Sequence, residues 1–142
     1  MKILLPVDGS KYSLDAVNSL IEHSNWYREK PSVELLTVHL PVPKLPNMNL
    51  VVGKNQIQRY YREEGEASLA EAKKRLDAAG IEYRAQILVG QIADTIVAQA
   101  KKTRCDLIFI GTHGRGAAAN LLLGSTASKV LHIAAVPVLL VR

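Results

Sequence analysis

Residues 107–126 read LIFIGTHGRGAAANLLLGST, so an apolar run leads directly into a glycine-rich turn and a Gly-Ser pair. The run from Leu107 to Ile110 contains no polar residue, which is typical of a parallel strand buried on both faces. A second run of this kind, ILLPV, occupies residues 3–7. These two segments predict the central strands of a parallel sheet.

Five apolar runs alternate with four helical patterns along the whole chain, which predicts an α/β fold with helices on both faces of a parallel sheet. The apolar spacing places the helices around residues 14–21, 69–79, 92–100 and 127–134. Ser10 or Ser13 is the expected N-cap of the first helix and Ser125 that of the last, while Gly80 should end the second. Residues 83–88 alternate in polarity and are expected at one edge.

Length and composition indicate one globular domain over residues 1–142. Apolar residues make up 48% of the chain and charged residues 22%, close to the average of globular proteins. The opening residues contain neither a signal-peptide core nor a spanning helix, so we expect no membrane association. Cys105 is the single cysteine, so it can form no internal disulfide. We expect a cytoplasmic protein in which Cys105 is a small buried hydrophobe.

The formal net charge of +5 raises the question of nucleic-acid binding. Basic residues are interspersed with acidic ones, as in residues 71–77, EAKKRLD, which is typical of a solvated helix face. Aromatic residues make up 5% of the chain, which provides little surface for base stacking. We therefore expect no nucleic-acid partner.

Prolines mark two further segments. Residues 41–49, PVPKLPNMN, carry three prolines and follow the second predicted strand at its carboxyl end, so they form either a ligand cover or a plain connector. The final run, Val136 to Val141, contains Pro137, which favours an edge strand. An uncharged apolar edge needs a cover, and a homodimer through this strand or a helix or loop of the same chain would supply one.

The turn after Ile110 has the composition of a phosphate site. Glycines at a strand end permit positive φ angles and let a phosphate approach the backbone amides. At the other end of the segment, free amides after Gly124 and the hydroxyls of Ser125 and Thr126 lie at the positive end of a helix. The two ends together predict a site for a polyphosphate.

Two common nucleotide motifs do not fit this segment. A P-loop needs a lysine before its Ser or Thr, whereas Gly124 is followed directly by Ser125. Gly114, Gly116 and Ala119 have the spacing of a dinucleotide fingerprint, but the acidic residue expected about twenty positions later falls in the apolar last run. We exclude both interpretations.

The spacing that fits is Gly111, Gly114 and, after nine further residues, Gly124-Ser125. It resembles the ATP-binding branch of the universal stress protein family. The resemblance covers nearly the whole chain, because PVDGS at residues 6–10, Val38 and PVLLV at residues 137–141 also match the family pattern.

The resemblance implies an adenine-nucleotide alpha-hydrolase-like fold, a doubly wound five-stranded sheet of order 3-2-1-4-5, and a homodimer through the last strand. It also implies that Pro6, Val7 and Asp8 border adenine and ribose and that Val38 meets the adenine. The residues implied for ribose and phosphates are Gly111, Thr112, His113, Gly114, Arg115, Gly116, Ala117, Gly124, Ser125 and Thr126. Residues 117–119 supply no side-chain donor, so backbone amides and Arg115 would have to hold the phosphates there.

Catalytic residues are harder to assign. Asp8 could reach a ribose hydroxyl or a magnesium or manganese ion, or it could cap the first helix. His113 is expected to bind a phosphate, while His23, His39 and His132 lack metal-ligand spacing and are interpreted as surface or packing residues. We expect an ATP-binding regulator in the stress response with slow or no hydrolysis. An ATP-hydrolysing or adenylyl-transferring enzyme and a nucleotide-free dimerisation scaffold are the alternatives.

Overall fold

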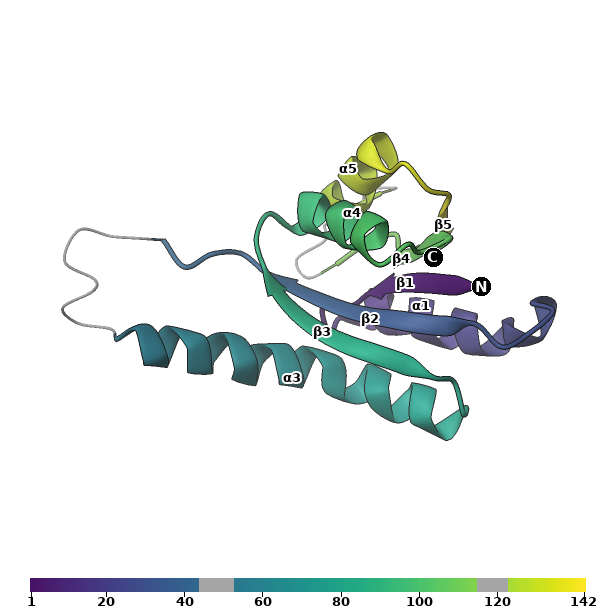
Figure 1. Ribbon diagram of the computed structural model, residues 1–142, viewed down its shortest axis with the longest axis horizontal. Helices are drawn as coiled ribbons and strands as arrows, with labels where there is room; N and C mark the ends of the chain where they lie inside the picture. The colour runs from purple at the N-terminus through teal and green to yellow at the C-terminus, as the bar shows by residue number, and fades with distance from the viewer. Residues whose placement is uncertain (44–52, 115–122) are drawn as a thin grey trace.

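The computed structural model describes residues 1–43, 53–114 and 123–142, in which strands and helices alternate along the chain (Figure 1). In chain order the elements are β1 (Lys2–Pro6), α1 (Lys11–Glu22), η1 (Ser24–Trp26), β2 (Ser32–His39), α3 (Lys54–Ala78), β3 (Tyr83–Val89), α4 (Ile92–Lys102), β4 (Leu107–Gly111), α5 (Ser125–Ile133) and β5 (Val138–Val141).

The five strands form one parallel sheet of order β3-β2-β1-β4-β5. This confirms the doubly wound fold and the strand order that the family resemblance implied. The apolar runs at residues 3–7 and 107–110 form the central strands β1 and β4, as predicted. The alternating segment forms β3 at one edge, and the last strand forms the other.

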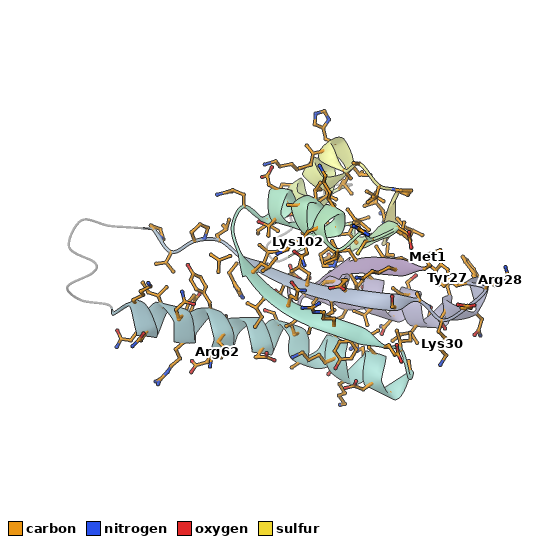
Figure 2. The ribbon with its side chains drawn as sticks, in the orientation of Figure 1. Met1, Tyr27, Arg28, Lys30, Arg62 and Lys102 are labelled. Carbon is orange, nitrogen blue, oxygen red and sulfur yellow. The ribbon has the colours of Figure 1, made fainter. Side chains whose placement is uncertain are left out.

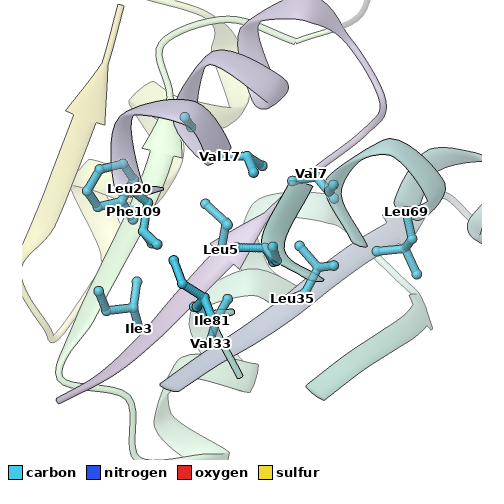
Figure 3. Packing of buried hydrophobic residues seen from close by; sticks show 13 residues of the cluster. Ile3, Leu5, Val7, Val17, Leu20, Val33, Leu35, Leu69, Ile81 and Phe109 are labelled. Atoms are coloured by element: carbon cyan, nitrogen blue, oxygen red, sulfur yellow. The ribbon is translucent and has the colours of Figure 1, made fainter. Parts of the chain in front are cut away.

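Two helical layers cover the sheet, α1 and α3 on one face and α4 and α5 on the other (Figure 1). Successive side chains of β1 point to opposite faces of the sheet. Ile3 and Leu5 pack toward α1 and α3, while Leu4 packs toward α4 and α5. Figure 3 shows Leu5, Leu20 and Phe109 in the first of these layers. The unbroken apolar pattern of the central strands follows from burial on both sides.

Helix positions agree with the sequence except at the start of α3, which begins at Lys54 and not near residue 69, and at the N-cap of α5. Ser10 is the N-cap of α1, and its side chain accepts a hydrogen bond from the Ser13 amide at 3.3 Å. Gly80 follows α3 with a φ of +60°, as its predicted stop role requires. The N-cap of α5 is Gly124, whereas Ser125 is its first helical residue, so the prediction of Ser125 as cap was wrong.

The segments marked by proline are placed as follows. Residues 41–43 form neither helix nor strand, while residues 44–49 of the proline-rich stretch lie outside the described residues. Pro137 precedes β5, and its carbonyl oxygen accepts a hydrogen bond from the Ile108 amide at 3.0 Å. Proline has no amide hydrogen to donate, so the edge strand β5 begins at the next residue, Val138. Cys105 is 4% exposed, which confirms the prediction of a buried thiol.

Candidate functional site

A cleft of about 540 Å³ opens at the carboxyl ends of β1, β2 and β4. The strand order reverses between β1 and β4, because the chain proceeds outward to β2 and β3 on one side and to β5 on the other. In open α/β sheets, ligands bind outside the carboxyl ends of the strands at such a reversal. The volume lies within the usual range of small-molecule sites, roughly 300–1,000 Å³.

The structure brings most of the predicted site residues together in this cleft. Its lining includes Pro6, Val7, Asp8, Val38, Gly111, Thr112, His113, Gly114, Gly124, Ser125 and Thr126. Arg115, Gly116 and Ala117 lie outside the described residues. Residues separated by more than a hundred positions in the sequence thus share one surface.

Gly111 has a packing role that the sequence did not indicate. In the described residues the glycines with positive φ are Gly9, at 77°, and Gly80, whereas Gly111, Gly114 and Gly124 have ordinary angles. A Cβ on Gly111 would lie 2.5 Å from the carbonyl oxygen of Tyr12. Close packing of β4 against the first turn of α1 therefore requires glycine at position 111, and the positive φ that glycine permits is not used there.

Asp8 organises the turn between β1 and α1. Its Oδ1 accepts a hydrogen bond from the Ser10 amide at 2.9 Å, and its own amide donates to the Ser13 hydroxyl at 3.3 Å. Ser10 provides the helix cap, so Asp8 is not the N-cap of α1. A Cβ on Gly114 would lie 2.8 Å from Asp8 Oδ2, which places this carboxylate beside the strand-end turn.

The start of α5 faces the same cleft. The Gly124 amide donates a 2.7 Å hydrogen bond to the Thr112 carbonyl oxygen, and this bond joins the end of β4 to the start of α5. Ser125, Thr126 and Ala127 line the cleft in the first turn of the helix. Amides of a first helical turn have no partner within the helix and carry a partial positive charge. This end of the cleft can therefore bind an anion.

The imidazole of His113 is held at the strand end by two contacts. Its Nδ1 lies 3.0 Å from the Thr112 hydroxyl oxygen, and its ring centroid lies 5.0 Å from that of Tyr12. Tyr12 belongs to the first turn of α1, so the two contacts hold the ring between β4 and that helix. These contacts place the imidazole at the lining of the cleft.

The charge of the cleft comes from few side chains. Among the described lining residues Asp8 is the one carboxylate, and none is Lys or Arg. Arg28 and Lys30 lie at the other end of the sheet, beside the amino terminus (Figure 2). The described residues hold no group of three or more His, Cys, Asp or Glu side chains suited to a metal ion. Attraction for a phosphate within the described part of the cleft thus comes mainly from backbone amides.

Sequence reasoning identified only Val38 in the wall formed by β2, α3 and α4. The additional lining residues are Ser13, Leu36, Thr37, His39, Leu40, Tyr60, Ser68, Ile92, Ile96, Ile110 and Ala127. His39, interpreted as an ordinary surface or packing residue, lies in this wall, and its ring centroid is 6.0 Å from that of Tyr61. Helical and strand periodicity identified the faces of these elements but gave no sign of where they meet.

None of the helices in the described ranges combines the length and the apolar character needed to cross a lipid bilayer. The longest of them, α3, is interrupted throughout by charged residues.

Comparison with known proteins gives a consistent result. The sequence model of the universal stress protein family matches residues 1–142. The chain is 32% identical to universal stress protein MJ0531 of Methanocaldococcus jannaschii over 141 residues, which covers 99% of this chain and 81% of the relative.

Solved structures agree with the family match. The structure of MJ0577, a universal stress protein of the same organism, superposes with a TM-score of 0.82 and 28% identity, covering 99% of this chain and 94% of the other. A universal stress protein in complex with cAMP superposes with a TM-score of 0.67 and 25% identity over 100% and 96% of the two chains. The chain belongs to the universal stress protein family.

Proposed function

We propose that this chain binds an adenine nucleotide, ATP, in the cleft at the carboxyl ends of β1, β2 and β4. The observation that carries the proposal is the Thr112–Gly124 hydrogen bond, which joins the strand-end turn and the start of α5 into one surface. The cAMP complex of a structurally similar family member supports an adenine ligand. Membership of the ATP-binding branch is part of this proposal.

The proposed orientation of the nucleotide follows the chemistry of the cleft. Pro6, Val7 and Asp8 border adenine and ribose, and Val38 meets the adenine, since this end is largely apolar. The ribose and phosphates extend toward α5, where amides and hydroxyls can donate to phosphate oxygens. The residues proposed to hold them are Gly111, Thr112, His113, Gly114, Gly124, Ser125 and Thr126, together with Arg115, Gly116 and Ala117.

A divalent cation fits this arrangement. Mg²⁺ in nucleotide sites is held by one or two carboxylates together with phosphate oxygens. Asp8 supplies one carboxylate beside the strand-end turn. We propose that Mg²⁺ or Mn²⁺ accompanies ATP and offsets the charge of the phosphates.

We propose a regulatory role in the stress response, with slow or no hydrolysis. Rapid phosphoryl transfer needs an oriented nucleophile and cations placed to neutralise developing charge. The proposed site offers only part of this apparatus, with Arg115 and the metal ion as cations and with His113 engaged by Thr112 and Tyr12. Such a site is suited to retaining ATP, so that the fraction of the protein with bound ATP follows the ATP concentration.

The edge strand supports a proposed homodimer. Val136 to Val141 carries no charged residue, and Leu139 on β5 is 38% exposed. An apolar edge of this kind is stabilised by pairing with its symmetry mate. We place the dimer in the cytoplasm, in keeping with a single buried cysteine and no disulfide.

Equilibrium unfolding in urea with and without Mg-ATP tests the binding proposal. ATP at a hundred times its dissociation constant should raise the free energy of unfolding by about 2.7 kcal/mol. Inorganic tripolyphosphate should stabilise less, because it lacks the nucleoside. No stabilisation at millimolar ATP would refute nucleotide binding, and turnover near 1 s⁻¹, within the ordinary range of enzymes, would refute the regulatory role.

A further inference from the structure

Thr37 lies in the wall of the cleft that sequence motifs did not mark. Along β2, Val33 and Leu35 pack toward α1 and α3 while Leu36 packs toward α4. Strand alternation therefore turns Thr37 toward α1 and α3. Its side chain lines the cleft, and the residue is 2% exposed.

The hydroxyl of Thr37 forms no hydrogen bond within the described part of the chain, in contrast to other buried hydroxyls. The Ser13 hydroxyl donates to the Ser10 carbonyl oxygen at 2.9 Å. The Thr112 hydroxyl lies 3.0 Å from His113 Nδ1. Thr37 Oγ1 is not among the fully buried polar atoms without a partner, so it is accessible from the cleft, and a ligand there can supply its hydrogen bond.

The surroundings of Thr37 indicate which part of a ligand it meets. Leu36 pairs with Pro6 in the sheet, and the Val7 amide donates to the Leu36 carbonyl oxygen at 2.8 Å, so Thr37 lies next to Val7. Leu40 and the ring of Tyr60 line the same cleft. Ser125 and the other anion-binding groups come from α5, which packs on the other face of the sheet.

We infer that the Thr37 hydroxyl hydrogen bonds to the nucleoside part of the bound nucleotide. This inference rests on the proposed function and adds a specificity residue to it. A hydroxyl both donates and accepts, so it can pair with a ring nitrogen, an exocyclic amine or a ribose hydroxyl. Within the described residues Thr37 has no protein partner that this bond would have to replace.

Thr37→Val tests this inference because valine has nearly the shape of threonine without its hydroxyl. The dissociation constants of ATP and adenosine, measured by isothermal titration calorimetry, should both rise by about 3- to 10-fold, the value of one hydrogen bond. The affinity for inorganic tripolyphosphate should not change. Urea unfolding of the ligand-free variant should show unchanged or increased stability. Thr37→Ser keeps the hydroxyl, so the ratio of its affinities for ATP and tripolyphosphate should equal that of the wild type.

Thr103→Val is the matched control, since the Thr103 hydroxyl donates to the Gln99 carbonyl oxygen at 2.7 Å, away from the cleft. It should lower stability and leave the ATP affinity unchanged. If Thr37→Val lost stability or failed to fold, the Thr37 hydroxyl would be hydrogen bonded to another group of the protein. That result would overturn the inference. Unchanged ATP affinity in that variant, with wild type binding, would also overturn it. If wild type binds no ATP, the proposed function fails and the inference falls with it.

Discussion

The Gly124 amide and the Thr112 carbonyl oxygen are joined by a 2.7 Å hydrogen bond across the gap between β4 and α5. A Cβ on Gly124 would lie 3.2 Å from that same oxygen and 3.4 Å from the Cα atom of His113. A side chain at position 124 would therefore crowd the backbone at the end of β4. Gly111 and Gly124 are required by backbone packing at the mouth of the cleft, and Gly114 leaves room for the Asp8 carboxylate, in addition to any contact with a ligand.

Gly114→Val should weaken ATP binding while the fold is retained. The new Cβ would lie 2.8 Å from Asp8 Oδ2, so the carboxylate must move and the valine would enter the proposed phosphate site. Steric crowding of this kind corresponds to a loss of about tenfold or more in affinity. Calorimetry with ATP measures the loss, and circular dichroism checks the fold. Retained affinity would show that the site has been misplaced.

Gly111→Ala should destabilise the protein by about 1–3 kcal/mol, measured by urea unfolding. The added methyl group would lie 2.5 Å from the Tyr12 carbonyl oxygen and 3.0 Å from its carbonyl carbon, and backbone atoms in α1 cannot rotate away. Gly53→Ala is the control, because nothing lies within 4 Å of its Cβ position. Equal effects at the two positions would contradict the packing role of Gly111.

Leu139→Lys should convert the proposed dimer to a monomer. The side chain is 38% exposed on edge strand β5, where a charge opposes strand pairing between copies. Leu131→Lys changes a residue on α5 that is 42% exposed and should remain dimeric. Size-exclusion chromatography with light scattering distinguishes the two states. A wild-type protein that is monomeric at micromolar concentration would exclude the dimer.

Cys105 should make stability depend on pH in the alkaline range. Burial raises the pKa of its thiol, so the native state keeps the proton while the unfolded chain loses it above about pH 8.5. The unfolded state then binds fewer protons, and stability falls as pH rises, by at most about 1.4 kcal/mol per pH unit. The difference in unfolding free energy between wild type and Cys105→Ala should shrink from pH 7.5 to 9.5. A constant difference would contradict the shifted pKa.

Much of the fold could be predicted because buried positions are occupied by apolar residues, which the sequence shows directly. The unbroken apolar runs of β1 and β4 follow from helices on both faces, and Pro137 marked the edge position of the last strand. The strand order came from the family resemblance, since periodicity does not specify which strands pair. The N-cap of α5 was assigned to Ser125 and not to Gly124, because Gly124 is held by a backbone hydrogen bond, which does not depend on side-chain identity.

The candidate site could be predicted only in part. Its anion-binding half comes from consecutive residues, so spacing alone located Gly111, Gly114 and Gly124. The opposite wall is assembled from Thr37 on β2, Tyr60 on α3 and Ile92 on α4, which have no fixed spacing. Their convergence depends on how the helices cross the end of the sheet, which the sequence pattern does not reveal.

The most direct test of nucleotide binding is a titration of ¹⁵N-labelled protein with Mg-ATP, followed by two-dimensional amide NMR spectra. We predict saturable shifts at one ATP per chain, largest for Val7, Asp8, Thr112 to Gly114 and Gly124 to Ala127, with smaller shifts at Thr37 and Val38. Arg28 and Lys30, at the other end of the sheet, should not respond. An absence of saturable shifts, or shifts confined to that other end, would contradict the account.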